Sequence, residues 1–567
     1  MRLFVLLAFA FALISLALVV SQHPSFVEQT RQLVGTSSLS NEKGSSSSHD
    51  WASQFEHTTT IEMRDDSWQA LSGFPSFAKY SFPLPQNADL VAARLRLQLH
   101  SQLAQGGVGS LRVAVNDVRR AEVVLNQGQE QKTLLLGLSP EDLARSNVTV
   151  SLSAQGDIFH GSCPSRPARG AIVDLLPSSG VQLAHSGPLT DPHDLWLVSA
   201  PAPQIPLIQK NTGQDLADAL LLAARLRQSD IAANFVTVLE SEPTIVSAVP
   251  IENPSTLVVN REQDLVFAFE PTTATFSVRD PNGVGTLLAG AAPVRVSDLI
   301  SRSDSRGTSD EYALITETNA QSFFRSNRWR VNYNLADLDG GQAPKRLNLA
   351  LKLAKQQLGE EWLINVRFNT SLLSSDRLES ELDTFIKAIP LPHALTQVEN
   401  VITIDLATTQ GSNAGCDPGL ELTAQLLPES KLDGKAILDL NVPAYLIEIL
   451  AQSNGIILNA EHAVTPTQAA LSADLLAYIL PTEAAVSVTD DEPSEAAKIE
   501  VLTKAALEER LKALPLANAT KNFWLVSQDT ISGTGKSSFK IVPLTPKLIA
   551  SETISMPENA VFLLIEA

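Results

Sequence analysis

Short stretches in which apolar and polar residues alternate recur along most of the chain. The segments RLRLQL from Arg94, LRVAVND ending at Asp117 and SNVTVSL around Asn147 alternate with a period of two, and Gly, Pro, Asn and Asp separate such segments. This pattern is typical of half-buried β-strands joined by turns. It predicts an antiparallel β-sandwich over residues 58–186.

The same succession of strands returns further along the chain. Five pairs of anchors keep one order at offsets of 251 to 253 residues: Arg94 and Arg346, Asn116 and Asn369, Asn147 and Asn400, Cys163 and Cys416, and Leu175 and Leu426. A nearly constant offset over five anchors indicates a duplication. We therefore expect a second β-sandwich over residues 320–438.

Two kinds of anchor in this repeat could have carried chemistry. Asn116 and Asn369 each end a strand, where Asn suits a turn because it tolerates a left-handed backbone. We interpret both as turn residues, with ligand contact as the alternative. Cys163 and Cys416 are the two cysteines of the chain, and we expect them to be buried and reduced in separate sandwiches. A disulfide remains the alternative, and we expect no zinc because neither cysteine has a CxxC partner or a nearby histidine pair.

The segments after each predicted sandwich have a different pattern, and we expect α/β domains over residues 187–319 and 439–567. In the first of them, DLWLVSA reads as a strand, the segment from Thr212 as a helix capped by that residue, and NFVTVLE as a strand. In the second, Thr465 with Pro466 and Gln468 predicts a capping box at the start of a helix. Strands alternating with helices indicate parallel sheets.

The N-terminus has the pattern of an export signal. From Leu3 to Val20 only Ser15 interrupts an apolar run that follows Arg2. As a helix this run would extend about 27 Å, close to the thickness of a bilayer's hydrocarbon core. Residues 1–21 are therefore a cleaved signal peptide or a retained anchor, and both remain open. Residues 22–57 read as a Ser-rich linker.

Composition limits the partners. A chain of 567 residues is too long for one core, and 44 % hydrophobic with 18 % charged residues is typical of globular domains. The net charge of −20 argues against a nucleic-acid partner, since phosphate binding needs clustered Lys and Arg.

The domain order and three segments resemble the periplasmic B subunit of bacterial cellulose synthase. These segments are YSFPLPQNADLVAARLRLQLHSQL, SLRVAVNDVRRAEVVL, and the Cys163 phrase running into LLPSSGVQL. The resemblance covers most of the chain from about Phe74 and is weak in the last domain. It implies two jelly-roll-like sandwiches alternating with two flavodoxin-like α/β domains.

The resemblance also implies a location and partners. A member of this family is a non-catalytic accessory subunit of a cellulose synthase on the periplasmic face of the inner membrane. It partners a membrane-embedded processive glycosyltransferase and guides the glucan polymer outward. Members usually end in a transmembrane helix, which this sequence lacks at Ala567. Either the N-terminal segment is the anchor, or the protein is a periplasmic or secreted relative without a synthase partner.

The sequence gives little support for nucleotide binding, cofactor binding or catalysis. Arg302 and Arg306 have the RxxxR spacing associated with cyclic di-GMP, but no DxSxxG element follows. The prolines of APAPQIPLIQKNTGQ supply no N–H donors for a cofactor phosphate, so we expect no cofactor. No GxSxG or HExxH motif occurs, and we interpret the protein as non-enzymatic.

One residue stands out as a candidate sugar contact. Trp329 in RSNRWRVNY lies between arginines, and aromatic rings are common platforms for sugars. Trp362 lies in an apolar strand and is expected in the core. The functional hypothesis is a polysaccharide-synthase accessory subunit, and the alternative is a soluble or tethered polysaccharide-binding matrix protein.

Overall fold

The computed structural model describes residues 51–567 apart from a series of internal segments. The segments left out are 64–68, 75, 105–106, 161–162, 165–170, 199–202, 209–212, 230, 232, 239–255, 273, 289–293, 296–299, 303–310, 315–319, 324–325, 355–360, 380–381, 410–421, 440–441, 461–463, 489–495, 515–521, 529–538 and 545–559. The leader at 1–21 and most of the linker at 22–57 also lie outside the described residues. Within the described part of the chain, no helix has the length and apolarity needed to cross a membrane.

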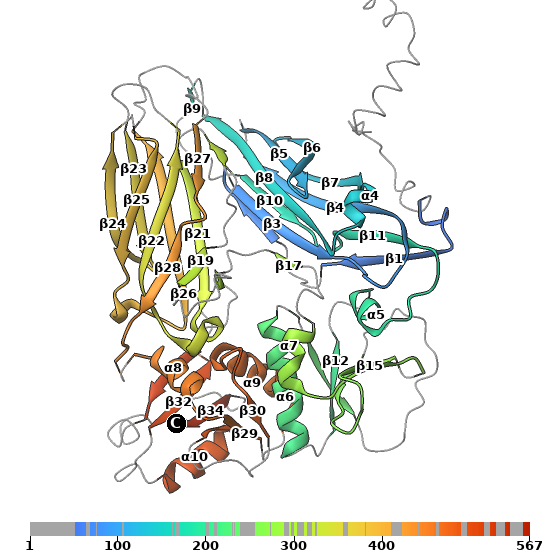
Figure 1. The fold of residues 1–567 in the computed structure, drawn as a ribbon, viewed down its shortest axis with the longest axis vertical. Helices are drawn as coiled ribbons and strands as arrows, with labels where there is room; N and C mark the ends of the chain where they lie inside the picture. Colours follow the sequence, from blue (N-terminus) through green and yellow to red (C-terminus); the bar gives the residue numbers. More distant parts are fainter. Residues whose placement is uncertain are drawn as a thin grey trace, which may run out of the picture.

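Four regions alternate along the chain, and most of the described fold is β-sheet. Figure 1 shows two β-rich regions in the upper half of the molecule, blue to cyan and yellow to orange, with two helix-containing regions below them. Each β-rich region contains two sheets in a sandwich-like arrangement.

The first β-rich region places one sheet against another. The first sheet has the order β1-β11-β4-β10-β2 with β7 also paired to β4, and its strands are β1 (His57–Glu62), β2 (Gln69–Ser72), β4 (Leu90–Leu103), β7 (Gly128–Gly137), β10 (Ala171–Leu175) and β11 (Gly180–His185). The second sheet has the order β17-β3-β8-β5-β6 with β9 paired to β8, and its strands are β3 (Ser76–Pro83), β5 (Gly107–Val115), β6 (Val118–Leu125), β8 (Asn147–His160), β9 (Cys163–Pro164) and β17 (Val294–Arg295).

The predicted alternation decides which side of each strand is buried. In β4, Leu95 and Leu97 are fully buried, whereas Arg96 and Gln98, which alternate with them, point outward and are partly exposed. Each fully buried leucine stabilises the fold by about 1.5 to 3 kcal/mol relative to an exposed one.

The second β-rich region repeats the strand order of the first, apart from the short strands β9, β17 and β18. Its sheets have the orders β18-β19-β28-β22-β27-β20, with β25 on β22, and β21-β26-β23-β24. The strands are β18 (Ile300–Arg302), β19 (Glu311–Leu314), β20 (Gln321–Phe323), β21 (Ser326–Asn334), β22 (Pro344–Leu353), β23 (Trp362–Phe368), β24 (Ser371–Leu378), β25 (Thr384–Pro390), β26 (Glu399–Thr408), β27 (Leu422–Leu426) and β28 (Lys431–Lys435). Thus β19-β28-β22-β27-β20 corresponds to β1-β11-β4-β10-β2, and β21-β26-β23-β24 to β3-β8-β5-β6. The duplication indicated by the sequence is present in the fold.

The two remaining regions each contain a mixed sheet with helices. The first has the order β13-β12-β14-β16-β15, and the second β30-β29-β31-β34-β32-β33. Their strands are β12 (Gln204–Ile208), β13 (Asn234–Val238), β14 (Thr256–Val259), β15 (Phe267–Glu270), β16 (Thr275–Val278), β29 (Ile456–Asn459), β30 (Val486–Ser487), β31 (Ala497–Thr503), β32 (Phe523–Gln528), β33 (Phe539–Pro543) and β34 (Val561–Glu566). In both, the first three strands are parallel and lie in the order second, first, third.

The helices lie mainly in these two regions. They are α4 (Pro140–Leu143), α5 (Pro192–Val198), α6 (Gln214–Gln228), α7 (Val284–Leu287), α8 (Tyr445–Gln452), α9 (Pro466–Ile479) and α10 (Lys504–Ala513), with 3-10 turns η1 (Pro281–Gly283), η2 (Leu335–Asp337), η3 (Asp339–Gly341) and η4 (His393–Leu395). The capping box predicted at Thr465 is confirmed: its side chain accepts from the Gln468 N–H, and the Gln468 side chain accepts from the Thr465 N–H. Helix α6 follows Gly213 without a side-chain cap, and Thr212 lies outside the described residues.

Two sequence expectations are corrected by the elements. The segment DLWLVSA was expected to be a strand, but its described residues Asp194–Val198 belong to α5. The helix forms because Asp191 accepts from the N–H groups of His193 and Asp194 and Pro192 occupies the first turn. The second sandwich was expected from residue 320, but β19 at Glu311–Leu314 already pairs with β28.

The repeated Leu-Leu-Pro phrase has the same structural role in both sandwiches. Ser179 and Ser430, which follow it, are fully buried, and each hydroxyl accepts from the backbone N–H of the central strand, that of Gln98 at 2.9 Å and that of Ala350 at 3.0 Å. Each hydroxyl also lies within hydrogen-bond distance of the carbonyl of the same residue. The phrase therefore fixes a corner between neighbouring strands.

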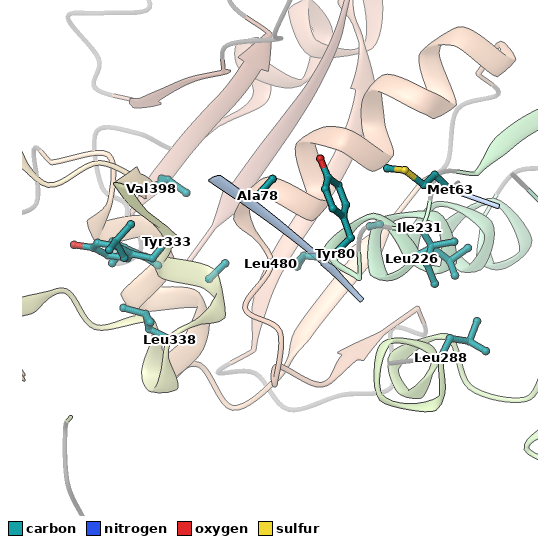
Figure 2. Close-up of a cluster of buried hydrophobic side chains, with 14 of the residues drawn as sticks. Met63, Ala78, Tyr80, Leu226, Ile231, Leu288, Tyr333, Leu338, Val398 and Leu480 are labelled. Carbon is teal, nitrogen blue, oxygen red and sulfur yellow. The ribbon is translucent and has the colours of Figure 1, made fainter. Parts of the chain in front are cut away.

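Apolar side chains from all four regions belong to one continuous core. Figure 2 shows members of this core from the first sandwich (Tyr80), the first α/β region (Leu226), the second sandwich (Tyr333) and the last region (Leu480). The equivalent helices α6 and α9 also pack against each other. The four regions are thus joined by packing as well as by the chain.

Candidate functional site

Trp329, the residue predicted as an aromatic platform, lies in the core of the second sandwich. Its side chain is 3 % exposed, whereas Arg328 and Arg330 on either side are exposed. The prediction is wrong because successive residues of a strand point to opposite faces, and here the apolar residue takes the inward position. Trp362 is fully buried, as expected.

The correction reveals a cluster of arginines on the outer face of the same sheet. We call the outward residues Arg328, Arg330, Arg367 and Arg377 the arginine face. Arg328 lies opposite Asp405 of β26, and Arg330 lies opposite Thr403. On the other side of β26, Arg367 lies opposite Thr403. The three strands therefore place Arg330, Thr403 and Arg367 in one row across the sheet.

The charges of the arginine face are only partly balanced. Arg328 and Arg367 both donate to Asp405, and Arg377 donates to Glu361. Arg330 donates to the Asn332 side-chain oxygen at 3.2 Å and forms no ion pair with a carboxylate of the described residues.

The corresponding face of the first sandwich has different chemistry. Strand pairing places Phe77 opposite Ser153, and Ser153 opposite Arg112, in the row equivalent to Arg328 and Asp405. Ala78 and Tyr80 point into the core, so Phe77 is on the outer side, where it is partly exposed. We call Phe77, Lys79, Ser151, Ser153 and Arg112 the hydroxyl face.

At the edge of the hydroxyl face, the carboxylate of Glu122 pairs with two arginines. The Ser110 hydroxyl donates to Glu122 at 2.9 Å, and Arg112 and Arg119 also pair with this carboxylate. The Ser110 hydrogen bond, together with the contacts from the two arginines, lowers the pKa of Glu122 despite the opposing effect of burial. Glu122 therefore stays ionised and keeps both guanidinium groups oriented.

Asn116 and Asn369 have the left-handed backbone that the sequence indicated, with φ of 49° and 54°. The side-chain oxygen of Asn116 accepts from the Thr149 N–H, and that of Asn369 accepts from the Val401 N–H. The side-chain amide of Asn116 donates to Asp142 at 2.8 Å, and that of Asn369 donates to the Leu395 carbonyl at 2.7 Å. These contacts identify both as turn residues that tie one strand end to the next.

Asp142 completes the turn of the first sandwich. Its carboxylate is buried and accepts from Asn116, from Arg120 at 2.9 Å, and from the backbone and hydroxyl of Ser139. Burial by itself would raise the pKa of Asp142, but the hydrogen bonds from Ser139 and Asn116 and the charge of Arg120 lower it.

The stability contributed by Asp142 is expected to depend on pH. Since its folded-state pKa is below the unfolded value of about 3.9, the contribution is present above that value and is lost as the pH falls through the folded-state pKa. Asp142→Asn should lower the free energy of unfolding by about 2 kcal/mol at pH 7. In guanidinium titrations the difference in free energy of unfolding between wild type and variant should become smaller below pH 4. A difference in free energy of unfolding that stays constant from pH 7 to pH 3 would contradict the ionised state assigned to Asp142.

The predictions for the cysteines fall largely outside the described residues. Cys416 lies in the segment 410–421, and of Cys163 only the backbone pairing with His160 is described. Arg302 lies in β18 opposite Tyr312, whereas Arg306 lies in the segment 303–310. Among the residues that the structure does describe, no group of three or more His, Cys, Asp or Glu side chains could hold a metal ion.

A cavity of about 400 Å³ opens beside α4 in the first sandwich. It is lined mainly by small and apolar residues at the start of β4 and around α4, with Gln86 and Arg145 as polar groups. None of its lining residues belongs to the arginine face or the hydroxyl face.

Comparison with known proteins yields only low similarities. No protein-family model and no curated protein matches the chain. Among solved structures, the CBM36-1 domain of a xylanase from the hindgut metagenome of Trinervitermes trinervoides is 9 % identical, over 23 % of this chain and all of that one, with a TM-score of 0.15. A family two carbohydrate esterase from Clostridium thermocellum is 15 % identical, over 32 % of this chain and 50 % of that one, with a TM-score of 0.12.

A third structure is the GH26-CBM35 β-(1,4)-mannanase of Podospora anserina. It is 11 % identical over 32 % of this chain and 41 % of that one, with a TM-score of 0.13. Carbohydrate-binding modules and carbohydrate-active enzymes thus recur among the structural neighbours. The TM-scores are too low for these similarities to support a function.

Proposed function

We propose that the protein is an exported, non-catalytic polysaccharide-binding subunit that assists a cellulose or related β-glucan synthase. The two sandwiches contact the polymer, as jelly-roll-like modules do, and the two flavodoxin-like α/β domains hold them in place. The partner is a membrane-embedded processive glycosyltransferase, and neither cyclic di-GMP nor nucleic acid takes part. This proposal extends the resemblance to the periplasmic B subunit of cellulose synthase.

The observation that carries the proposal is the row across the hydroxyl face. Phe77, Ser153 and Arg112 lie side by side on three paired strands and point outward. The C–H face of a pyranose ring packs on an aromatic ring, while its hydroxyls exchange hydrogen bonds with hydroxyl and guanidinium groups. The outer surface of a sheet can offer such contacts to one side of an extended polymer.

The joined core supports a guiding role. Apolar packing connects all four regions, so the two sandwich faces keep a fixed relation to each other. A subunit that directs a growing polymer needs binding surfaces whose spacing does not change. The parallel order second, first, third in both α/β regions agrees with the start of a flavodoxin-like sheet.

Full-length protein purified in detergent is expected to be retained on insoluble β-1,4-glucan. Phe77→Ala should weaken retention about fivefold, because it removes the aromatic surface. Phe77→Leu keeps an apolar side chain of similar size and should weaken retention nearly as much. Leu265→Ala, at an exposed apolar residue outside the sandwiches, is the matched control and should have no effect.

A second measurement tests the synthase partner. The tagged full-length protein is purified from solubilised membranes, and the accompanying proteins are identified by mass spectrometry. Recovery of a membrane glycosyltransferase is expected. Retention on glucan without recovery of any glycosyltransferase would favour the matrix-protein alternative. If both Phe77 variants were retained as well as the wild type, the hydroxyl face would be removed from the proposal.

A further inference from the structure

The arginine face differs from its counterpart at outward positions while the inward positions of the two sandwiches stay apolar. By strand pairing, Arg328, Arg330, Arg367 and Arg377 of the second sandwich correspond to Phe77, Lys79, Ala114 and Val124 of the first. The buried positions between them, such as Val366 and Ile404, correspond to Val113 and Leu152, which are buried as well. The core explains the inward residues but not the arginines, because the first sandwich forms with Phe77, Lys79, Ala114 and Val124 at those outward positions. Of these four counterparts, Lys79 is the one that is also a cation.

The charge of this face points to an anionic ligand. Within the described residues, its four arginines pair with two carboxylates, Asp405 and Glu361, which leaves two positive charges unbalanced. Glu399 is four residues along β26 from Thr403, beyond the arginine rows. A local excess of positive charge on a chain of net charge −20 is a specific attraction for anions rather than a general property of the surface.

The row formed by Arg330, Thr403 and Arg367 has the geometry for a carboxylate. The two arginines lie on strands separated by β26, so their backbones are roughly 9.6 Å apart. Guanidinium groups bind carboxylates through paired N–H donors, and their long side chains can converge on a group above Thr403. The Thr403 hydroxyl lies between them and can contact a sugar hydroxyl of the same polymer.

We propose that the arginine face binds a carboxylated polysaccharide, in which uronate groups meet Arg330 and Arg367. This rests on the proposed polysaccharide-binding function and narrows the ligand of the second sandwich. A membrane surface fits less well, because among the described residues of this sheet Leu372, opposite Arg367, is the one large apolar side chain that is exposed, and no exposed aromatic side chain accompanies it. The first sandwich holds neutral sugar units at Phe77, and the second selects acidic ones.

The test compares polygalacturonate with its fully methyl-esterified form, using full-length protein in detergent and affinity electrophoresis. We expect binding to the acid form and little binding to the ester. Arg330→Gln should weaken binding to the acid form about threefold, and Arg330→Gln with Arg367→Gln about tenfold. Raising the salt from 0.05 to 0.5 M should weaken wild-type binding more than that of the double variant, since salt screens exposed charges.

Arg346→Gln is the matched control, because Arg346 is also an exposed arginine, lies on the other sheet of the same sandwich and pairs with Asp433. It removes the same charge and should leave binding unchanged. Equal binding of acid and ester forms, unaffected by the double variant, would overturn the inference but leave polysaccharide binding intact. Absence of binding to both forms and to β-1,4-glucan would defeat the proposed function as well.

A binding test with anionic vesicles distinguishes a lipid surface from a carboxylated polysaccharide as the anionic ligand. Vesicles of phosphatidylcholine with phosphatidylglycerol are mixed with the same proteins and sedimented. We expect no sedimentation that depends on Arg330 and Arg367. Sedimentation lost in the double variant, without binding to polygalacturonate, would replace the polysaccharide by a lipid surface and overturn the inference.

Discussion

Arg225→Ala is expected to lower the free energy of unfolding by about 3 kcal/mol and to weaken the contact between the two α/β regions. Arg225 lies in α6 with its side chain 2 % exposed. Its guanidinium donates to the carbonyls of Pro481 at 2.9 Å and Ala484 at 2.6 Å, in the segment that follows α9. It also donates to Gln228, whose own amide donates to the Leu480 carbonyl. Alanine would leave these carbonyls without donors and open a cavity.

A second substitution separates hydrogen bonding from packing. Burial lowers the pKa of Arg225 to about 10, an effect that the charge of Asp280 opposes. The buried charge itself therefore disfavours folding, and the hydrogen bonds must offset that cost. Arg225→Met removes both the charge and the donors but fills the space, so we expect it to lose about 2 kcal/mol, less than alanine.

Guanidinium denaturation followed by circular dichroism measures both variants. Arg279→Ala is the control, because Arg279 is an exposed arginine of the same region whose side chain, in the described structure, donates only to the Asp264 carbonyl at 3.3 Å. It should change stability by less than about 0.5 kcal/mol. Arg225→Met as stable as the wild type would mean that the cross-domain hydrogen bonds add no net stability.

Much of this fold follows from local pattern and from the repeat. The alternation in β4 and β22 predicts both strands and their buried sides, since a period of two leaves one arrangement that buries the leucines of RLRLQL and RLNLAL together. The capping box at Thr465 predicts the start of α9 because its contacts lie within four residues. The constant offset of the anchors predicts the second sandwich before any of its strands is assigned individually.

The errors arise where a short sequence fits two structures. The apolar run in DLWLVSA is short enough for either a strand or a buried helix, and only Asp191 and Pro192 before it favour the helix of α5. The second sandwich begins earlier than residue 320, because its first sheet already contains β18 (Ile300–Arg302) and β19 (Glu311–Leu314). Strand β19 is four residues long, too short for a period to be recognised, and its place is fixed by pairing with β28.

The candidate site needed more than one strand to be recognised. In RSNRWRVNY the alternation already placed Trp329 and its flanking arginines on opposite faces, so the sequence held the signal that Trp329 is buried. That Arg367 joins Arg330 in one row depends on the register of β21, β26 and β23. Register across three strands is set by tertiary pairing and cannot be obtained from any one segment.

Asn369→Ala is expected to cost about 3 kcal/mol, because the substitution removes two kinds of stabilisation at once. The side chain of Asn369 accepts from the Val401 N–H at 2.9 Å and donates to the Leu395 carbonyl at 2.7 Å. Its φ of 54° lies in the left-handed region, where alanine is disfavoured. Asn369→Gly relaxes the backbone but still loses the hydrogen bonds, so we expect it to cost about 2 kcal/mol. Thr370→Ala, at the exposed neighbour, is the control.

The duplication makes the same experiment available twice in one molecule. Asn116 has the equivalent φ of 49° and the equivalent contact with the Thr149 N–H, so Asn116→Ala should show the same difference from Asn116→Gly. The two turns lie in separate sandwiches with no shared partner, and their costs should add in the double alanine variant to within about 0.5 kcal/mol. If the alanine and glycine variants lost equal free energy of unfolding at both positions, the left-handed backbone would make no contribution to the loss. A double variant much less stable than the sum would show that the common core couples the sandwiches during unfolding.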